Sequence, residues 1–167
     1  MPGVSTAVGG ASRAVRVGCP RCASTNWLEA DALLGLPHCG RCGSPLFDGR
    51  PVQLTRATWT THGAESDVPL LVLFEAPWSG ACRRAARSFD EAAARLEPRF
   101  RLGRVNVEEE QPLCARLRSR ALPCLAVFRG GHELARRDGP ADLETIVTWA
   151  EAVARTPAPS PRPLLFR

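Results

Sequence analysis

Four of the seven cysteines have the spacing of a metal site. They form two Cys-x2-Cys pairs, CPRC at 19–22 and CGRC at 39–42, separated by 16 residues. Two tight turns of this kind bring four thiolates around one ion, and a closed tetrahedral set of four sulfurs is typical of structural Zn²⁺. We therefore expect one structural zinc ion, held by Cys19, Cys22, Cys39 and Cys42. Two disulfides, or an iron centre of the same geometry, are the alternatives that the spacing leaves open.

The segment that contains these cysteines, residues 17–50, has little apolar content. We expect metal binding to supply the free energy of its folding, because so short a segment cannot build a core of its own. His38 adjoins the second pair and is interpreted as an exposed neighbour, since four cysteines complete the ligand shell. Only Arg21 and Arg41 add positive charge within the pairs, so nucleic acid is not expected as a partner.

A second candidate site lies in APWSGACRR, residues 76–84. A cysteine at the N-terminus of a helix has its thiolate stabilised by free N–H groups and by the helix dipole, so it attacks disulfides. The residue at this helix start is Ser79, and Cys82 lies one turn later. A serine hydroxyl is not ionised near neutral pH and reacts only with the help of an adjacent base. Because serine is among the best N-cap residues, we interpret Ser79 as a helix cap.

Hydrophobic patterning places these residues on an α/β framework. Continuous or alternating apolar runs predict strands, and apolar residues at three- and four-residue steps predict helices. The predicted strands are 52–54, 68–76, 100–107, 124–129 and 132–137, and the predicted helices are 80–97, 109–120 and 140–154. This order is typical of an α/β sheet that ends in an antiparallel hairpin, turned at Gly130-Gly131.

Composition divides the chain into four segments. Residues 1–16 are rich in small residues and are expected to be a disordered arm. A four-cysteine module spans 17–50, and an α/β domain spans 51–155. Residues 156–167 have proline at every second position from 157 to 163 and are expected to form an extended tail.

Charge and hydropathy indicate a protein that does not enter membranes. No stretch approaches the roughly 20 apolar residues of a membrane helix, and the N-terminus lacks the apolar core of a signal peptide. The net charge is +5, with arginines scattered among acids, which is typical of a solvated mixed surface. We expect a cytoplasmic protein, in which cysteines serve as metal ligands or redox groups.

The chain resembles the thioredoxin family in several motifs that occur in the family's order. LFEAPWSGACR (73–83) resembles the Trp-Cys-Gly-Pro-Cys active-site motif. RVNVEEEQPLCARLRSRALPCLAVFRGG (104–131) resembles the following strand, helix, cis-proline loop and terminal hairpin. The cysteine pairs followed by CGSPLFDGRPVQLT (42–55) resemble the thioredoxin-2 subfamily, which carries a zinc module ahead of the thioredoxin domain. The resemblance covers about 19–153.

This resemblance implies a thioredoxin fold, a mixed central sheet flanked by helices, preceded by a small zinc ribbon. It implies a protein-disulfide reductase, in which a first cysteine attacks a disulfide and a second cysteine resolves the mixed disulfide. It also places Trp78, Leu122 and a cis Pro123 in a groove that binds extended segments of proteins or peptides.

Four residues depart from the family's pattern. Ser79 stands at the position of the nucleophilic cysteine, and Ala81 replaces the proline of the motif. Leu73 stands where the family has a buried Asp that assists proton transfer, and Glu75 stands where it usually has a second Trp. Because the nucleophile and its proton relay are both missing, we predict a weak or inactive disulfide reductase that retains the binding of proteins or peptides.

Two alternative functions remain open. In the first, Cys82 at the resolving position acts as a single thiol, or forms a relocated redox pair with Cys124, which directly follows Pro123. Cys114 lies between two apolar residues and is interpreted as a packing residue. The second alternative is a nucleic-acid-binding zinc ribbon attached to a structural thioredoxin domain.

Overall fold

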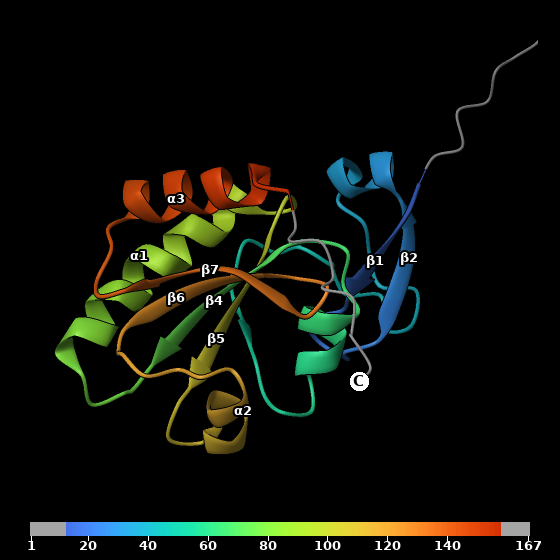
Figure 1. Ribbon diagram of the computed structural model, residues 1–167. Coiled ribbons are helices and arrows are strands. Elements are labelled where there is room, and N and C mark those ends of the chain that lie inside the picture. Colours follow the sequence, from blue (N-terminus) through green and yellow to red (C-terminus); the bar gives the residue numbers. More distant parts are fainter. Residues whose placement is uncertain (1–12, 158–167) are drawn as a thin grey trace, which may run out of the picture.

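The computed structural model describes residues 13–157, which form a five-stranded and a two-stranded sheet (Figure 1). The strands of the larger sheet are β3 (Val52–Gln53), β4 (Leu70–Glu75), β5 (Arg101–Asn106), β6 (Cys124–Arg129) and β7 (His132–Asp138). Their order in space is β3-β5-β4-β6-β7. Strands β3, β4 and β5 run parallel, whereas β6 pairs antiparallel with both β4 and β7. The predicted mixed sheet with a terminal hairpin is confirmed.

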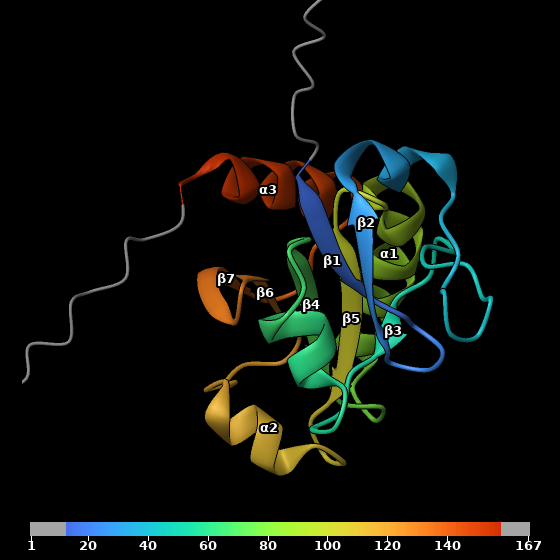
Figure 2. The ribbon, with the colours of Figure 1, turned by 90° about the vertical axis from the view of Figure 1, so that its right-hand side faces the viewer.

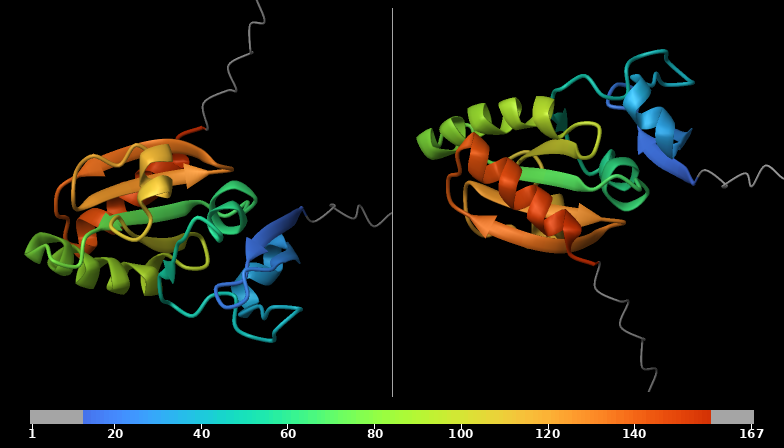
Figure 3. Two further views of the ribbon diagram at one scale, coloured as in Figure 1. Left: turned by 90° about the horizontal axis from the view of Figure 1, so that it is seen from below. Right: turned by 90° about the horizontal axis from the view of Figure 1, so that it is seen from above.

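Helices cover both faces of this sheet. Helix α1 (Gly80–Leu96) and helix α3 (Leu143–Arg155) lie together over one face, as the view from above shows (Figure 3). The short helix α2 (Gln111–Arg116) and a π-helical turn, Thr60–Ala64, pack on the other face. Within residues 13–157, no helix is long and apolar enough to cross a lipid bilayer.

The apolar run of β4 explains why the sheet is covered on both sides. Side chains alternate along a strand, so Leu71 and Leu73 face α1 and α3, while Val72 and Phe74 face the opposite core. A continuous apolar run is the pattern of a central strand that is buried on both faces. Strand β4 therefore delivers the segment 76–79 to one end of the sheet, where α1 begins.

The N-terminal segment forms a small sheet of its own. Strands β1 (Ala14–Gly18) and β2 (Thr25–Glu29) pair antiparallel, and a 3-10 turn, Ala30–Gly35, follows them. This sheet lies beside the end of the larger one (Figure 1), and Figure 2 views the molecule from the side of the small sheet. A third apolar cluster fills the space between them; it consists of Val17, Cys19, Cys39, Leu46, Phe47 and Val68.

Strand β1 corrects part of the expectation of a disordered arm. It begins at Ala14, inside the segment 1–16 that composition assigned to that arm. The strand is stabilised by contacts far away in sequence: Arg16 pairs with Asp67 at 2.8 Å, and the buried Val17 joins the third cluster. Residues 1–12 and 158–167 lie outside the described part of the chain, so the expectations for the arm and for most of the tail remain expectations.

Two predicted helices have different limits in the structure. Helix α2 spans Gln111–Arg116 instead of 109–120, and Arg118 has a positive φ of 55°, which is incompatible with a continuing helix. Helix α3 begins at Leu143 instead of residue 140, because the Asp142 carboxylate caps it by accepting a hydrogen bond from the Thr145 N–H at 2.8 Å.

Candidate functional sites

Ser79 lies at the N-terminus of α1 and acts as its cap. Its backbone is extended (φ −80°, ψ 121°), and its Oγ accepts a hydrogen bond from the backbone N–H of Cys82 at 3.3 Å. This is the N-cap geometry that the sequence predicts. Within residues 13–157, no carboxylate or imidazole bonds to this hydroxyl, so no base is in place to activate it.

Cys82 is enclosed beneath this cap. The residue is 1% exposed, and its Sγ accepts a hydrogen bond from the backbone N–H of Ala76 at 3.5 Å. Leu73, at the position of the family's buried acid, is fully buried in the apolar cluster under α1. A carboxyl group is therefore absent from this position, which the resemblance to the family assigns to proton transfer.

Cys82 and Cys124 have different hydrogen-bond partners in the structure. Cys124 packs in the cluster on the sheet face away from α1, beside Phe74 and Cys114. Its Sγ accepts a hydrogen bond from Arg136 Nη1 at 3.6 Å, and burial raises the pKa of this thiol to about 11. Cys82 and Cys124 are both free thiols, and a partner role of Cys124 remains a prediction. Its place on the face away from α1 does not favour that pairing.

Trp78 and the Leu122-Pro123 loop lie at the same end of the sheet as the start of α1. Trp78 is 68% exposed, and its Nε1 donates to Glu108 Oε1 at 2.6 Å. The Leu122-Pro123 peptide bond is cis, as the resemblance implied. Pro123 is buried and Leu122 is half-buried. Of these three apolar residues, Trp78 is therefore the most exposed to solvent.

Glu75, a further departure from the family pattern, is held in an ion-pair network. Arg104 Nε donates to Glu75 Oε1 at 2.7 Å, and Arg104 Nη1 lies 3.3 Å from Asp90 Oδ1. The Glu75 carboxylate is thereby paired on β4 and does not bond to Ser79 or Cys82. It supplies no replacement for the missing acid at Leu73.

The four N-terminal cysteines gather into one cluster. Their sulfur atoms all lie within 4.8 Å of one another, with Cys19 and Cys42 at 3.6 Å and Cys22 and Cys39 at 3.7 Å. A tetrahedral ion with metal–sulfur bonds of about 2.3 Å requires sulfur–sulfur separations of about 3.8 Å. The donor set and its spacing therefore fit a tetrahedral metal ion, and all seven cysteines of the chain are free thiols.

The two cysteine turns have the same local structure. The N–H groups of Cys19 and Cys39 each donate to the carbonyl oxygen five residues later, Ser24 or Ser44, at 2.8 Å. The N–H groups of Arg21 and Arg41 each donate to the sulfur two residues earlier at 3.4 Å. Hydrogen bonds of this kind favour the thiolate form, which is the form that binds metals. His38 is exposed and is not part of the cluster.

Three buried polar residues between this cluster and the larger sheet were missed by the sequence analysis. They are Arg101, Glu97 and His62. Arg101 is 1% and His62 is 2% exposed, and the Glu97 side chain is 4% exposed. Burial raises the pKa of Glu97 to about 7 and lowers the pKa of His62 to about 4. Of the three, only Arg101 could have been noticed in the sequence, because it is a charged residue inside a predicted strand.

Comparison with known proteins identifies the domain that carries Ser79 and Cys82. The family model described as Thioredoxin matches residues 50–152, more than half of the chain. "Thioredoxin 1" of Nostoc sp. (strain PCC 7120 / SAG 25.82 / UTEX 2576) is 37% identical over 82 residues, which are 49% of this chain and 77% of that protein. "Thioredoxin C-3" of Corynebacterium nephridii is 26% identical over 133 residues, 80% of this chain and 91% of that protein.

Solved structures show the same fold. Chloroplastic thioredoxin z aligns with a TM-score of 0.58 at 22% identity, over 64% of this chain and 96% of its own. A mutant thioredoxin from Halobacterium salinarum NRC-1 aligns with a TM-score of 0.59 at 19% identity, over 66% of this chain and 96% of its own. Together with the family match, the sheet order and the placement of its helices, these similarities show that the chain belongs to the thioredoxin family.

Proposed function

We propose that this chain is a thioredoxin-2-like protein whose domain binds extended protein or peptide segments but lacks most or all disulfide-reductase activity. The observation that carries the proposal is the cap formed by Ser79, whose hydroxyl accepts from the N–H of Cys82 at the start of α1. This is the position at which the family's motif has its nucleophilic sulfur.

The chemistry of disulfide reduction explains why this replacement matters. In the family's reaction, a thiolate attacks one sulfur of the substrate disulfide, which breaks the S–S bond, forms a mixed disulfide and releases one substrate thiolate. A second thiolate then attacks the first cysteine's sulfur, releases the other substrate thiol and leaves the protein oxidised by two electrons. With Ser79 in place, the first step has no thiolate, and Leu73 offers no carboxyl group for the proton of the second.

Binding does not depend on these groups. Trp78 is exposed, and its indole is oriented by Glu108 on one side, while Arg83 Nη1 donates to the carbonyl oxygens of Pro77 and Trp78 at 3.1 and 3.3 Å. A fixed aromatic side chain at the same end of the sheet as the Leu122-Pro123 loop is suited to an extended segment. We infer that proteins or peptides with such segments are the partners of this surface.

The four-cysteine cluster is proposed to hold one structural Zn²⁺. Its sulfur–sulfur separations fit a tetrahedral ion, and four thiolates without an open position are typical of structural zinc. Thiolate ligation supplies folding free energy to a segment with little core of its own. The alignment with "Thioredoxin C-3" covers more residues than the chain holds from residue 50 to its end, so it extends into this segment and supports the link between module and domain.

The alternative function is a single-thiol oxidoreductase that uses Cys82. It predicts turnover that depends on this sulfur, although its burial and its bond to the Ala76 N–H oppose attack on a bulky disulfide. A reduction assay with a small dithiol as electron donor separates the two functions. The proposal expects equal background rates for the zinc-loaded protein and its Cys82→Ala variant; turnover that disappears in Cys82→Ala would support the alternative instead.

The binding part of the proposal has its own test. A library of extended peptides on an array, probed with the zinc-loaded protein, should give a subset of bound sequences, and Trp78→Ala should lose at least about tenfold in affinity for them. Arg129→Ala, a change on β6 away from this surface, is the matched control. Equal affinities for the native protein and Trp78→Ala would place binding elsewhere.

A further inference from the structure

A buried charge from β5 reaches into the four-cysteine module. Arg101 is the first residue of β5 and is 1% exposed. Its Nη2 donates to the carbonyl oxygen of Gly18 at 3.0 Å and to the carbonyl oxygen of Leu46 at 2.6 Å. Burial of a guanidinium is costly unless its charge is paired and its donors are bonded. The domain therefore depends on these two carbonyl oxygens of the module.

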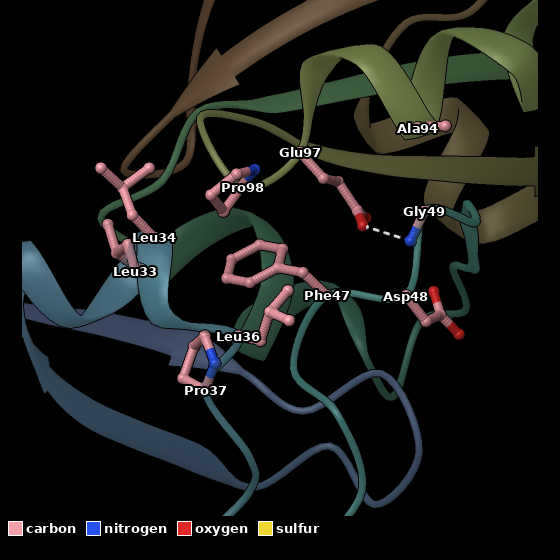
Figure 4. Close-up of a pocket in the computed structure, with 10 residues that line it drawn as sticks. All are labelled: Leu33, Leu34, Leu36, Pro37, Phe47, Asp48, Gly49, Ala94, Glu97 and Pro98. Atoms are coloured by element: carbon pink, nitrogen blue, oxygen red, sulfur yellow. Dashed lines mark hydrogen bonds between the residues drawn. The ribbon is translucent and has the colours of Figure 1, made fainter.

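Glu97 completes this contact from the end of α1. Its Oε1 accepts from Arg101 Nη1 at 3.3 Å, and its Oε2 accepts from the backbone N–H of Gly49 at 2.8 Å, the bond drawn in Figure 4. The Arg101 guanidinium also lies 4.5 Å from the centre of the Phe47 ring. The segment 46–49 is therefore held at three points: Arg101 binds the Leu46 carbonyl oxygen and contacts the Phe47 ring, and Glu97 binds the Gly49 N–H.

The carbonyl oxygens that Arg101 binds flank the two cysteine turns. Gly18 directly precedes Cys19, the first ligand of the cluster. Leu46 follows the second turn, and its N–H donates to the Pro37 carbonyl oxygen at 2.9 Å, which closes a loop around Cys39 and Cys42. One side chain therefore joins the backbone at the edges of both turns.

The approach at Gly18 is close enough to require glycine. A Cβ at this position would lie 2.8 Å from His62 Nδ1 and 2.7 Å from Thr61 Cγ2, both in the π-helical turn of the larger domain. Such separations are below van der Waals contact, so a side chain would displace the first cysteine turn or the π-helical turn. The first cysteine turn is thus fixed against the domain from two directions, by Arg101 and by this turn.

We propose that Arg101 is a positioning residue of the four-cysteine site, which holds the two cysteine turns at the separation that one metal ion requires. The proposal rests on the metal-binding function inferred above for the cluster. The coupling is reciprocal, because a bound ion fixes the carbonyl oxygens that the buried guanidinium needs. Metal binding therefore stabilises the thioredoxin domain as well as the module.

An apolar pocket beside this contact provides a second readout. Its volume is about 380 Å³, and Figure 4 shows it between Leu33, Leu34 and Pro37 of the module and Ala94 and Pro98 of the domain. Phe47 and Glu97, which Arg101 contacts, also line it. Phe47 is the buried apolar side chain of this lining. If the module separates from the domain, the Phe47 ring becomes exposed, and binding of a hydrophobic dye should rise.

The test measures Zn²⁺ affinity of the full chain by competition with a chromophoric chelator, well below the unfolding temperature. Arg101→Met should bind Zn²⁺ about 10–100-fold more weakly than the native protein, the usual effect of losing a residue that orients metal ligands. Arg101→Lys keeps the charge but loses the forked donors, and should lie between the two. Glu97→Gln, which keeps an acceptor for Gly49, should have a smaller effect than Arg101→Met.

Two matched controls separate positioning from general stability. Arg104→Met removes another arginine of β5, one that pairs with Glu75 and not with the module, and should leave Zn²⁺ affinity unchanged. Phe89→Ala destabilises the main core, a different apolar cluster from the one that includes Cys19 and Cys39, and should also leave Zn²⁺ affinity unchanged. Chelation should raise dye binding in the native protein, and Arg101→Met should show raised dye binding even with zinc bound.

The outcomes are distinguishable. Native protein that binds no Zn²⁺ would overturn the metal-binding function and this inference together. Native protein that binds one Zn²⁺ tightly, with equal affinity in Arg101→Met and Arg101→Lys, would overturn only the role of Arg101. If Arg101→Met does not fold, Arg101→Lys and Glu97→Gln decide the question, and native affinity in both contradicts the proposal.

Discussion

The hydroxyl oxygen of Ser79 accepts a hydrogen bond from the backbone N–H of Cys82 at 3.3 Å, where α1 begins. The same two positions carry the two redox cysteines in the thioredoxin motif that this segment resembles. In this chain the first position stabilises a helix and offers no thiolate.

Removal of the cap should cost stability without changing activity. Ser79→Ala deletes the acceptor of the Cys82 N–H, and the free energy of unfolding should fall by about 1 kcal/mol. Denaturant unfolding of the zinc-loaded protein measures this change. The free energy of unfolding of Ser79→Asp, which retains a capping oxygen, should fall by less. An unchanged free energy of unfolding in Ser79→Ala would mean that the cap contributes nothing.

An acid at position 73 should increase activity only when a nucleophile is present. In the Ser79→Cys background, Leu73→Asp places a carboxyl group on the sheet face under α1, where Leu73 is fully buried. Turnover in the disulfide-reduction assay should rise severalfold over Ser79→Cys alone, because the acid assists proton transfer. Leu73→Asn is the control for shape, and a gain of equal size in Leu73→Asn would exclude an acid–base role.

The same Leu73→Asp change should destabilise the domain. It replaces an apolar side chain in the main core with a group whose charged form is costly to bury, so the free energy of unfolding should fall by about 2–5 kcal/mol. Thermal or denaturant unfolding measures the loss. An unchanged free energy of unfolding would contradict the burial of position 73.

Acid should destabilise the protein through His62. Burial lowers the pKa of His62 to about 4 from an ordinary 6.5, so the folded state holds this imidazole neutral. As pH falls from 6.5 to 4, the unfolded chain binds a proton that the folded protein excludes, and stability should fall by up to about 3 kcal/mol. His62→Gln, measured at the same zinc saturation, should lose less stability over this range. Parallel pH profiles for the two proteins would contradict this assignment.

Chelation should unfold the module and weaken the domain. Hydrogen exchange should show loss of protection across residues 17–50, while residues 51–155 remain folded. The midpoint of thermal unfolding of the domain should nevertheless fall, because Arg101 loses ordered partners at Gly18 and Leu46. Full protection of residues 17–50 after the metal has been removed would contradict a metal-dependent module.

The features predicted from sequence are those that depend on local patterns. The apolar run of β4, the three-and-four spacing along α1 and the Gly130-Gly131 turn each follow from neighbours in the chain, and the structure has all of them. The cap at Ser79 is equally local. The cysteine spacing predicted a cluster, and four sulfurs within 4.8 Å of one another agree with it.

The features that sequence did not reveal depend on contacts between distant segments. Strand β1 is held by Arg16 and Asp67, and Arg101 reaches Leu46 across the interface between module and domain. Cys124 illustrates the same limit at one residue: it directly follows Pro123, but the register of β6 turns its side chain to the face away from α1. A one-residue difference in register reverses the face, and local sequence does not determine it.

The rate of disulfide reduction by the native protein, compared with that of Ser79→Cys, tests the central claim most directly. Both proteins are assayed zinc-loaded, at equal concentration, with the same small dithiol as donor. The account predicts a native rate at the dithiol background and a Ser79→Cys rate clearly above it, since one substitution restores a thiolate at the start of α1. A native rate well above background that Ser79→Cys does not increase would contradict it.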